Sequence, residues 1–167
     1  STIGSLNNTS TGIISSSVNS NSTLSTNGNS AYGLGIAIRL NNSDIIGALN
    51  NSGTIEANTD MTVNNTGDVY SYATGVGVYT TSSIDTLTNN ESGKISATAF
   101  AVNPNRYASA SAAGIRLDNS NITGALENAG TIDISSDIRG KAGSYGSANG
   151  INVTGGTTID SLINSFT

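Results

Sequence analysis

A repeat with a period of 36–43 residues constrains this chain more than any other feature of its sequence. Successive copies place a leucine in the same local setting, at intervals of 43, 38, 39 and 36 residues, and an asparagine follows each leucine by two positions. The closest match is between residues 39–55, which read RLNNSDIIGALNNSGTI, and residues 116–132, which read RLDNSNITGALENAGTI. Self-similarity at such a period indicates a fold built from stacked copies of one unit. The two aligned columns are Leu6, Leu49, Leu87, Leu126 and Leu162, and Asn8, Asn51, Asn89, Asn128 and Asn164.

Within each copy the apolar residues alternate with polar ones, as they do in strands that bury one face. Ile115 and Leu117 show this spacing of two, as do Ile132 and Ile134, and no stretch has sustained helical periodicity. Each copy supplies about three short strands, and a single circuit of them cannot bury its own apolar side. Copies stacked at ~4.8 Å do bury it. The sequence therefore predicts an all-β fold, a parallel β-helix (β-solenoid) of about five degenerate repeats of 36–43 residues, in a single domain over residues 1–167.

Stacking gives each aligned column a structural role. The leucines fill the interior, and the asparagine amides are expected to hydrogen-bond from rung to rung as a ladder. A glycine stands two positions before an isoleucine in the first four copies, and it is expected to mark a corner where the chain needs a positive φ. These glycines are Gly12, Gly53, Gly93 and Gly130.

The charged residues bear on how many rungs one repeat forms. Arg39 and Arg116 share one column, Glu56 and Asp133 share another, and each pair is two copies apart. Like charges directly opposite each other on neighbouring strands are destabilising. One rung per repeat would hold each pair roughly 10 Å apart, at twice the strand spacing. The pattern favours one rung per repeat, and the alternative of two rungs of about 19 residues stays open.

Three tyrosines form a further column. Tyr32, Tyr70 and Tyr145 each stand seventeen residues before their leucine, where the fourth copy has Ser109. We interpret the column as partly buried aromatic packing where the strand re-enters the rung. The alternative is an aromatic platform for a sugar.

The composition excludes several kinds of chemistry. The chain has no Cys and no His, so disulfides, thiolate metal sites and imidazole catalysis are absent. Six basic residues against eleven acidic ones disfavour nucleic-acid binding, and no apolar run approaches the ~20 residues that span a bilayer. We therefore predict no catalytic residues, no cofactor and no metal site, and a protein that is not an enzyme. A β-helix hydrolase or lyase would need a stacked Asp cluster beside basic residues, and Arg106, Arg139 and Lys141 fall in variable stretches without one.

Two segments carry a resemblance to a known family. They are AAGIRLDNSNITGALENAGTI at residues 112–132 and SANGINVTGGTTIDSLINS at residues 147–165. Their Gly-Ile-x-Val and Asn-x-Gly-Thr-Ile strands make the chain resemble the passenger domains of Gram-negative autotransporters, which use type V secretion. The resemblance implies an extracellular β-helix on the bacterial cell surface that serves as an adhesin or scaffold. Its implied partners are a host or neighbouring-cell surface, glycans, or further copies of itself.

Three functions follow as hypotheses. The first is an extracellular structural and adhesive module that displays variable loops on a rigid stalk, the loops being residues 15–34, 56–72, 96–111 and 133–147. The second is a self-assembling surface filament whose subunits stack end to end. The third is a carbohydrate-active β-helix enzyme. Because neither end of the sequence looks like a polar cap, we expect a fragment or an open-ended unit of a larger protein or assembly.

Overall fold

The computed structural model describes residues 1–22, 28, 30–64 and 67–165. These residues form an all-β parallel β-solenoid of about four turns and contain no helix, which confirms the predicted fold class. None of the described residues therefore belongs to a helix that could cross a membrane.

Each full turn contributes a strand to each of three parallel sheets, and in the first turn two short strands, β1 and β2, share the place in sheet A. Sheet A contains β1 (Thr2–Ile3), β2 (Leu6–Asn8), β5 (Asp44–Asn51), β8 (Ser83–Asn89), β11 (Asn121–Asn128) and β14 (Thr158–Asn164). Sheet B contains β3 (Ile13–Ser22), β6 (Thr54–Val63), β9 (Lys94–Val102) and β12 (Thr131–Arg139). Sheet C contains β4 (Ala31–Asn41), β7 (Val69–Tyr79), β10 (Ala108–Asp118) and β13 (Tyr145–Thr154).

One sequence repeat forms one rung of the solenoid. In sheet A, Leu6 pairs with Leu49, Leu49 with Leu87, and Leu87 with Leu126. This register excludes the alternative of two rungs per repeat. The five leucine copies make about four turns because, among the described residues, the first copy has no strand in sheet C and the fifth has none in sheet B.

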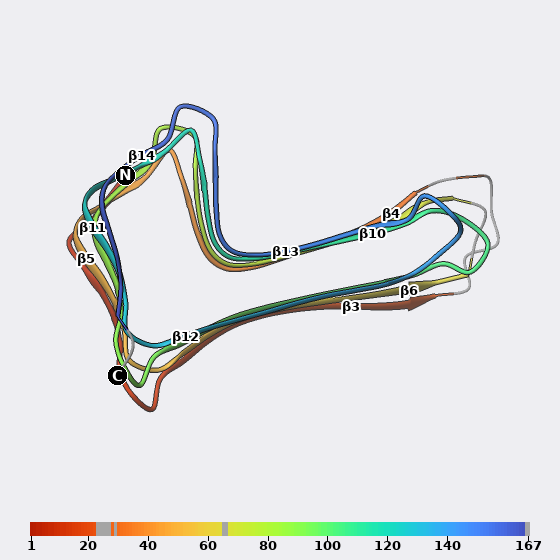
Figure 1. Ribbon diagram of the computed structural model, residues 1–167, viewed down its shortest axis with the longest axis horizontal. Helices are drawn as coiled ribbons and strands as arrows, with labels where there is room; N and C mark the ends of the chain where they lie inside the picture. The colour runs from red at the N-terminus through yellow and green to blue at the C-terminus, as the bar shows by residue number, and fades with distance from the viewer. Residues whose placement is uncertain (23–27, 29, 65–66, 166–167) are drawn as a thin grey trace.

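The molecule has a wide end and a narrow arm. Figure 1 shows sheets A, B and C surrounding the wide end, from which sheets B and C continue together as the arm. Isoleucine, leucine and valine fill the wide end, whereas the core of the arm is largely alanine. Large side chains fill the space between three walls, and alanines let two sheets pack closely, so the residue sizes set the shape of each rung.

A bulge in sheet A explains why alternate copies differ by one residue. Ile45 pairs with Ile84 and Leu49 with Leu87, although the even copy has one more residue between its isoleucine and leucine. The ladder shifts between Ile45 and Ala48, and β11 shows the same shift. Both apolar columns stay continuous because the extra residue is accommodated outside the ladder.

The prediction that the corner glycines adopt positive φ is wrong. A Cβ at Gly53 would instead meet the backbone oxygens of Thr9 and Gly12 in the preceding rung, and lie 3.0 Å from Nδ2 of Asn8. The column is glycine because successive rungs approach too closely there for a side chain. The described glycines that do have positive φ are Gly28, Gly143 and Gly155.

The stretches predicted as variable loops are mostly strands. Much of 15–34, 56–72, 96–111 and 133–147 belongs to the arm, where strands pair in register within sheet B and within sheet C. Alanine, serine and threonine occupy many inward positions there, so the alternation of strongly apolar and polar residues is weak. Arg139 accordingly lies on β12 and not in a loop. Residues 23–27, 29 and 65–66 of the predicted loops lie outside the described residues.

Candidate functional site: the tyrosine-bearing face of sheet C

The two columns singled out from the sequence lie inside the wide end. The leucines of β5, β8 and β11 are fully buried, whereas Leu162 on β14, at the last described rung, is 57% exposed. Each asparagine Nδ2 donates to the Oδ1 of the asparagine in the next rung, at 2.8, 2.8, 2.8 and 2.9 Å from Asn8 to Asn164. Three of these Nδ2 groups also donate to a backbone oxygen of the next rung, as Asn51 does to Lys94 at 3.1 Å. Both columns hold the rungs together.

The outer face of sheet C carries the tyrosines. The chain has six tyrosines, and five lie on β4, β7 or β13 at positions that alternate with core residues. The sixth lies immediately before β10. Tyrosine is large and amphipathic, so its confinement to one outer face is a clear asymmetry of the surface. The six are Tyr32, Tyr70, Tyr72, Tyr79, Tyr107 and Tyr145.

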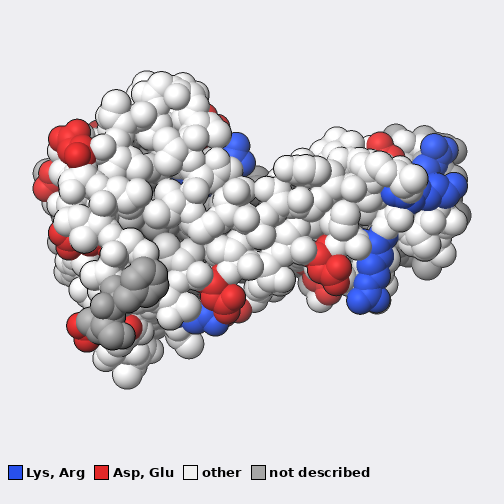
Figure 2. All heavy atoms as spheres, viewed as in Figure 1, with Lys and Arg blue, Asp and Glu red and all other residues white. Residues whose placement is uncertain are grey.

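Sheet C bends across this face. Its strands run along the arm and then turn sharply at the wide end (Figure 1), and the surface is hollowed at this junction (Figure 2). Between Thr74 and Val76 the ladder omits one column, which consists of Ala37, Gly75, Gly114 and Gly150. Small residues permit the tight bend because a Cβ at Gly75 would lie 2.7 Å from the backbone oxygen of Gly114. We call the concave outer side of this bend the crease.

Burial of outward positions supports the concave shape. By the alternation of the strands, Thr74 and Ala113 stand at positions that point out of the arm. Each is nevertheless only 4% exposed. Outward residues on a flat sheet face remain accessible, whereas in a crease the neighbouring walls cover them. The residues beside them along the arm are the tyrosines of β7 and the serines of β10.

Three tyrosines form an aromatic stack on the arm side of the crease. The Tyr32 and Tyr70 rings are nearly parallel, with centroids 4.7 Å apart, and Tyr107 tilts against Tyr70 at 5.9 Å. Burial is the main cause that raises the pKa of Tyr72 above its ordinary value, followed by the nearby Tyr32 and Tyr107. The charge of Arg116 acts in the opposite direction on the same phenol. Tyr72 therefore lies between the aromatic stack and the basic side of the crease.

Two arginines and a tyrosine form the other wall of the crease. Arg39 on β4 aligns with Gly77 on β7 and with Arg116 on β10. The Tyr79 ring fills the space that Gly77 leaves open, since a Cβ at Gly77 would collide with that ring. The guanidinium carbons of Arg39 and Arg116 lie 5.6 and 5.7 Å from the Tyr79 ring centroid. The ring separates two like charges and attracts both of them through its π face.

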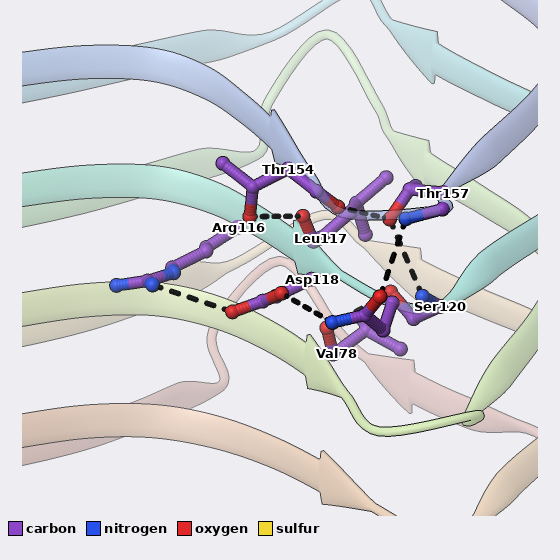
Figure 3. Close-up of polar contacts among 9 residues, drawn as sticks. Val78, Arg116, Leu117, Asp118, Ser120, Thr154 and Thr157 are labelled. Atoms are coloured by element: carbon purple, nitrogen blue, oxygen red, sulfur yellow. Dashed lines mark hydrogen bonds and ion pairs between the residues drawn. The ribbon is translucent and has the colours of Figure 1, made fainter.

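A hydrogen-bonded turn anchors the arginine wall, as Figure 3 shows. Nη2 of Arg116 lies 3.5 Å from Oδ2 of Asp118, and the Asn119 amide donates to Oδ1 of Asp118 at 3.0 Å. One residue further on, the Ser120 hydroxyl donates to the Val78 oxygen at 2.9 Å and ties this turn to the rung before it. The fixed turn limits the positions that Arg116 can adopt.

The chemical groups of this face are of three kinds. The face offers aromatic rings, phenol and serine hydroxyls and guanidinium donors, which are recognition groups. Within the described residues no group of three or more acidic side chains could hold a metal ion.

The sequence identified part of this face. The predicted alignment of Tyr32, Tyr70 and Tyr145 is correct, with Ser109 in the remaining rung. Partial burial, however, describes Tyr70 but not the other two, because Tyr32 is 68% and Tyr145 is 58% exposed.

Three tyrosines of the face were missed. Tyr72 stands two positions after Tyr70 and so shares its face, which the period of two could have revealed. Tyr107 likewise stands two positions before Ser109 of the predicted column. Tyr79 gave no such signal, because it lies beyond the bend of sheet C.

The class to which this protein is assigned is that of its fold, the parallel β-solenoid. No family model, curated protein or solved structure matches the chain.

Proposed function

We propose that this chain is a structural and adhesive β-solenoid module, exposed on the surface of a Gram-negative bacterium, that binds its partner through the crease of sheet C. It is a binding module and not an enzyme. The single observation that carries the proposal is the position of all six tyrosines on or beside one outer face. The resemblance to autotransporter passenger domains supports the location.

The scaffold supports a mechanical role. Successive full turns hydrogen-bond to each other in three sheets and through the asparagine ladder. A ligand face built on paired strands is more rigid than one built on loops, so less conformational entropy is lost when a partner binds. This favours a stalk whose side, rather than its loops, makes the contact.

The partner class remains that of a cell surface or its glycans. An exposed group of aromatic side chains on an otherwise polar protein marks an interaction site. Here Tyr32 and Leu34 are exposed side by side on the edge strand β4, with the tyrosines of β7 beside them.

Adhesion assays with matched aromatic variants test this function. The purified chain is applied to epithelial cells, to Gram-negative cells and to immobilised glycans. The double variant Tyr32→Ser/Tyr72→Ser imitates Ser109 and Ser111 in the same columns of β10, so the strands are expected to keep their pairing. We expect it to lose most of the binding, while Phe100→Ser, an aromatic change on sheet B, leaves binding unchanged.

Two outcomes would contradict the proposal. One is a wild-type chain that binds none of these surfaces. The other is equal binding by the wild type and the double variant while circular dichroism shows both to be folded.

End-to-end stacking is a second candidate function, favoured by the polarity of the asparagine ladder. Every Nδ2 donates toward the C-terminal rung, and in the last described step Asn128 donates to Asn164. A second copy stacked in the same direction would extend the ladder with the same sense. Sedimentation of the purified chain distinguishes the two functions, because a stacking subunit forms long particles as concentration rises and a monomeric adhesin does not.

A further inference from the structure

The arginine wall carries positive charge that the protein does not neutralise. The chain has net charge −5 and only six basic residues, yet Arg39 and Arg116 both lie in the crease. Arg116 has Asp118 as its ion-pair partner. The corresponding position beside Arg39 is Asn41, which cannot supply a charge.

Arg39 therefore has an unused guanidinium. The ion pairs among the described residues involve Lys94, Arg116 and Arg139, and Arg39 takes part in none of them. Among the described residues, the contact recorded for its guanidinium is a cation–π contact with the Tyr79 ring. A contact through the face of the guanidinium leaves its in-plane N–H donors available. Planar guanidinium donors match the two oxygens of a carboxylate.

A second unpaired donor lies in the same wall. Nε of Arg116 is buried and has no hydrogen-bond partner among the described residues. A buried donor without a partner is costly, and such groups often await a ligand or water. The two arginines are two rungs apart, about 10 Å at the spacing of β-strands.

The rest of the face favours a sugar over a protein. Alongside the tyrosines, β10 and β13 present four partly exposed polar side chains, which are Ser111, Ser147, Asn149 and Asn152. Serine is depleted at the centres of protein–protein interfaces. A pyranose has an apolar C–H face and a rim of hydroxyls, and it can match tyrosine rings with one and hydroxyl and amide groups with the other.

We propose that the crease binds an acidic glycan, with a sugar carboxylate on Arg39 and the adjoining sugar rings against Tyr72 and the Tyr32–Tyr70 stack. This inference rests on the proposed function of sheet C and names the ligand class for it. The partly exposed Arg116 guanidinium lies two rungs away along the crease, beside the next part of the glycan. The Tyr79 ring lies between the two guanidinium groups and keeps them apart.

The test compares sugars that differ only in charge. Binding of the folded chain to oligogalacturonate and to sialyllactose is measured by calorimetry, with methyl-esterified oligogalacturonate and the methyl ester of sialyllactose as the neutral counterparts. Poly-glutamate tests whether any flexible polyanion suffices. We expect at least one acidic sugar to bind roughly tenfold or more tightly than its neutral counterpart, the effect of a charge-assisted hydrogen bond.

A pair of arginine variants localises the effect. Arg39→Gln should lower affinity for the acidic sugar by about tenfold or more and leave affinity for the neutral sugar unchanged. Arg139→Gln makes the same charge change on sheet B, where Arg139 lies over Phe100 and near Asp137, and should have no effect.

Several results would overturn the inference. They are the absence of binding by either acidic sugar, equal affinity for acidic and neutral sugars, tighter binding of poly-glutamate, and equal losses in the two arginine variants. If the chain adheres through Tyr32 and Tyr72 but ignores charge, only the acidic ligand is wrong. If the tyrosine variant also adheres normally, the proposed binding face fails as well.

Discussion

At the scale of residues, the solenoid depends on side chains that bond along its axis and on the absence of side chains where rungs meet. Asn51 and Asn89 are buried, and each has its amide hydrogens used within the stack. Gly53 occupies a position where a methyl group would overlap the preceding rung. Asparagine and glycine, usually read as turn or disorder residues, are here parts of the packed structure.

The ladder predicts a large cost for one buried amide. Asn89→Ala removes the acceptor of Asn51 and the donor to Asn128, and we expect a loss of about 3 kcal/mol in unfolding free energy, because buried polar groups lose partners. Urea unfolding followed by circular dichroism measures it. Asn50→Ala is the control, because its bond to Asn7 is exposed, and it should change stability by less than about 0.5 kcal/mol. Equal effects of the two variants would contradict a structural ladder.

The glycine column predicts a steric cost. Gly53→Ala should destabilise the chain by about 1–3 kcal/mol, since the backbone oxygens it would meet cannot move independently of their rungs. Gly156→Ala meets nothing within 4 Å and serves as the control in the same unfolding experiment. If Gly53→Ala leaves the free energy of unfolding unchanged, the rungs are further apart than described.

At the scale of elements, residue size decides where three sheets become two. In the arm, Ala97, Ala99 and Ala101 on β9 are fully buried between sheets B and C. The wide end instead contains stacked isoleucines and leucines. The strands of the wide end are easy to predict from the sequence, because large apolar residues alternate with polar ones. The strands of the arm are hard to predict, because alanine and serine differ little in hydrophobicity.

The arm should therefore resist enlargement. Ala99→Leu is expected to lower unfolding free energy by about 1–3 kcal/mol, because the two sheets must separate to admit the longer side chain. Thr98→Leu, on the exposed side of the same strand, should have little effect. Calorimetric unfolding of both variants measures the difference, and a tolerated Ala99→Leu would argue against close packing of the arm.

The tyrosine face should respond to alkaline pH. Burial, as the first cause, raises the pKa of Tyr72 above its ordinary value near 10 in the folded chain. The unfolded chain then loses this proton at lower pH than the folded chain. The contribution of Tyr72 to stability is therefore fully present below about pH 10 and is lost as pH rises beyond it. Urea midpoints at about pH 8 and about pH 11 measure the fall, which should be smaller in Tyr72→Ser. If the urea midpoint of Tyr72→Ser falls by the same amount as that of the wild type, Tyr72 does not contribute to the loss of stability at alkaline pH.

At the scale of the whole molecule, the sequence was sufficient for the fold and insufficient for the site. Leu49 and Asn51 recur with their neighbours at a fixed spacing, and stacking such copies has essentially one solution. The crease depends on a bend of sheet C that brings Tyr72 near Arg116, although they are 44 positions apart in the sequence. The repeat period does not predict the angle of this bend. The angle depends on how closely the small residues of neighbouring rungs approach one another there.

The central claim is that one repeat forms one rung, which aligns the residues of the sheet C face. The chain has no cysteine, so an engineered disulfide can report the register without background. Ser111 pairs with Ser147 across β10 and β13, and Ser109 pairs with Tyr145. Cα atoms paired across strands are about 5 Å apart, within disulfide reach, whereas diagonal ones exceed about 7 Å.

The most direct measurement is therefore oxidation of two double variants, followed by mass spectrometry of the linked peptides. Ser111→Cys/Ser147→Cys should form an intramolecular disulfide in nearly all molecules, and Ser109→Cys/Ser147→Cys should stay reduced under the same conditions. Failure of the first pair to link, or preferential linking of the second, would contradict the register and with it the face on which the proposed function depends.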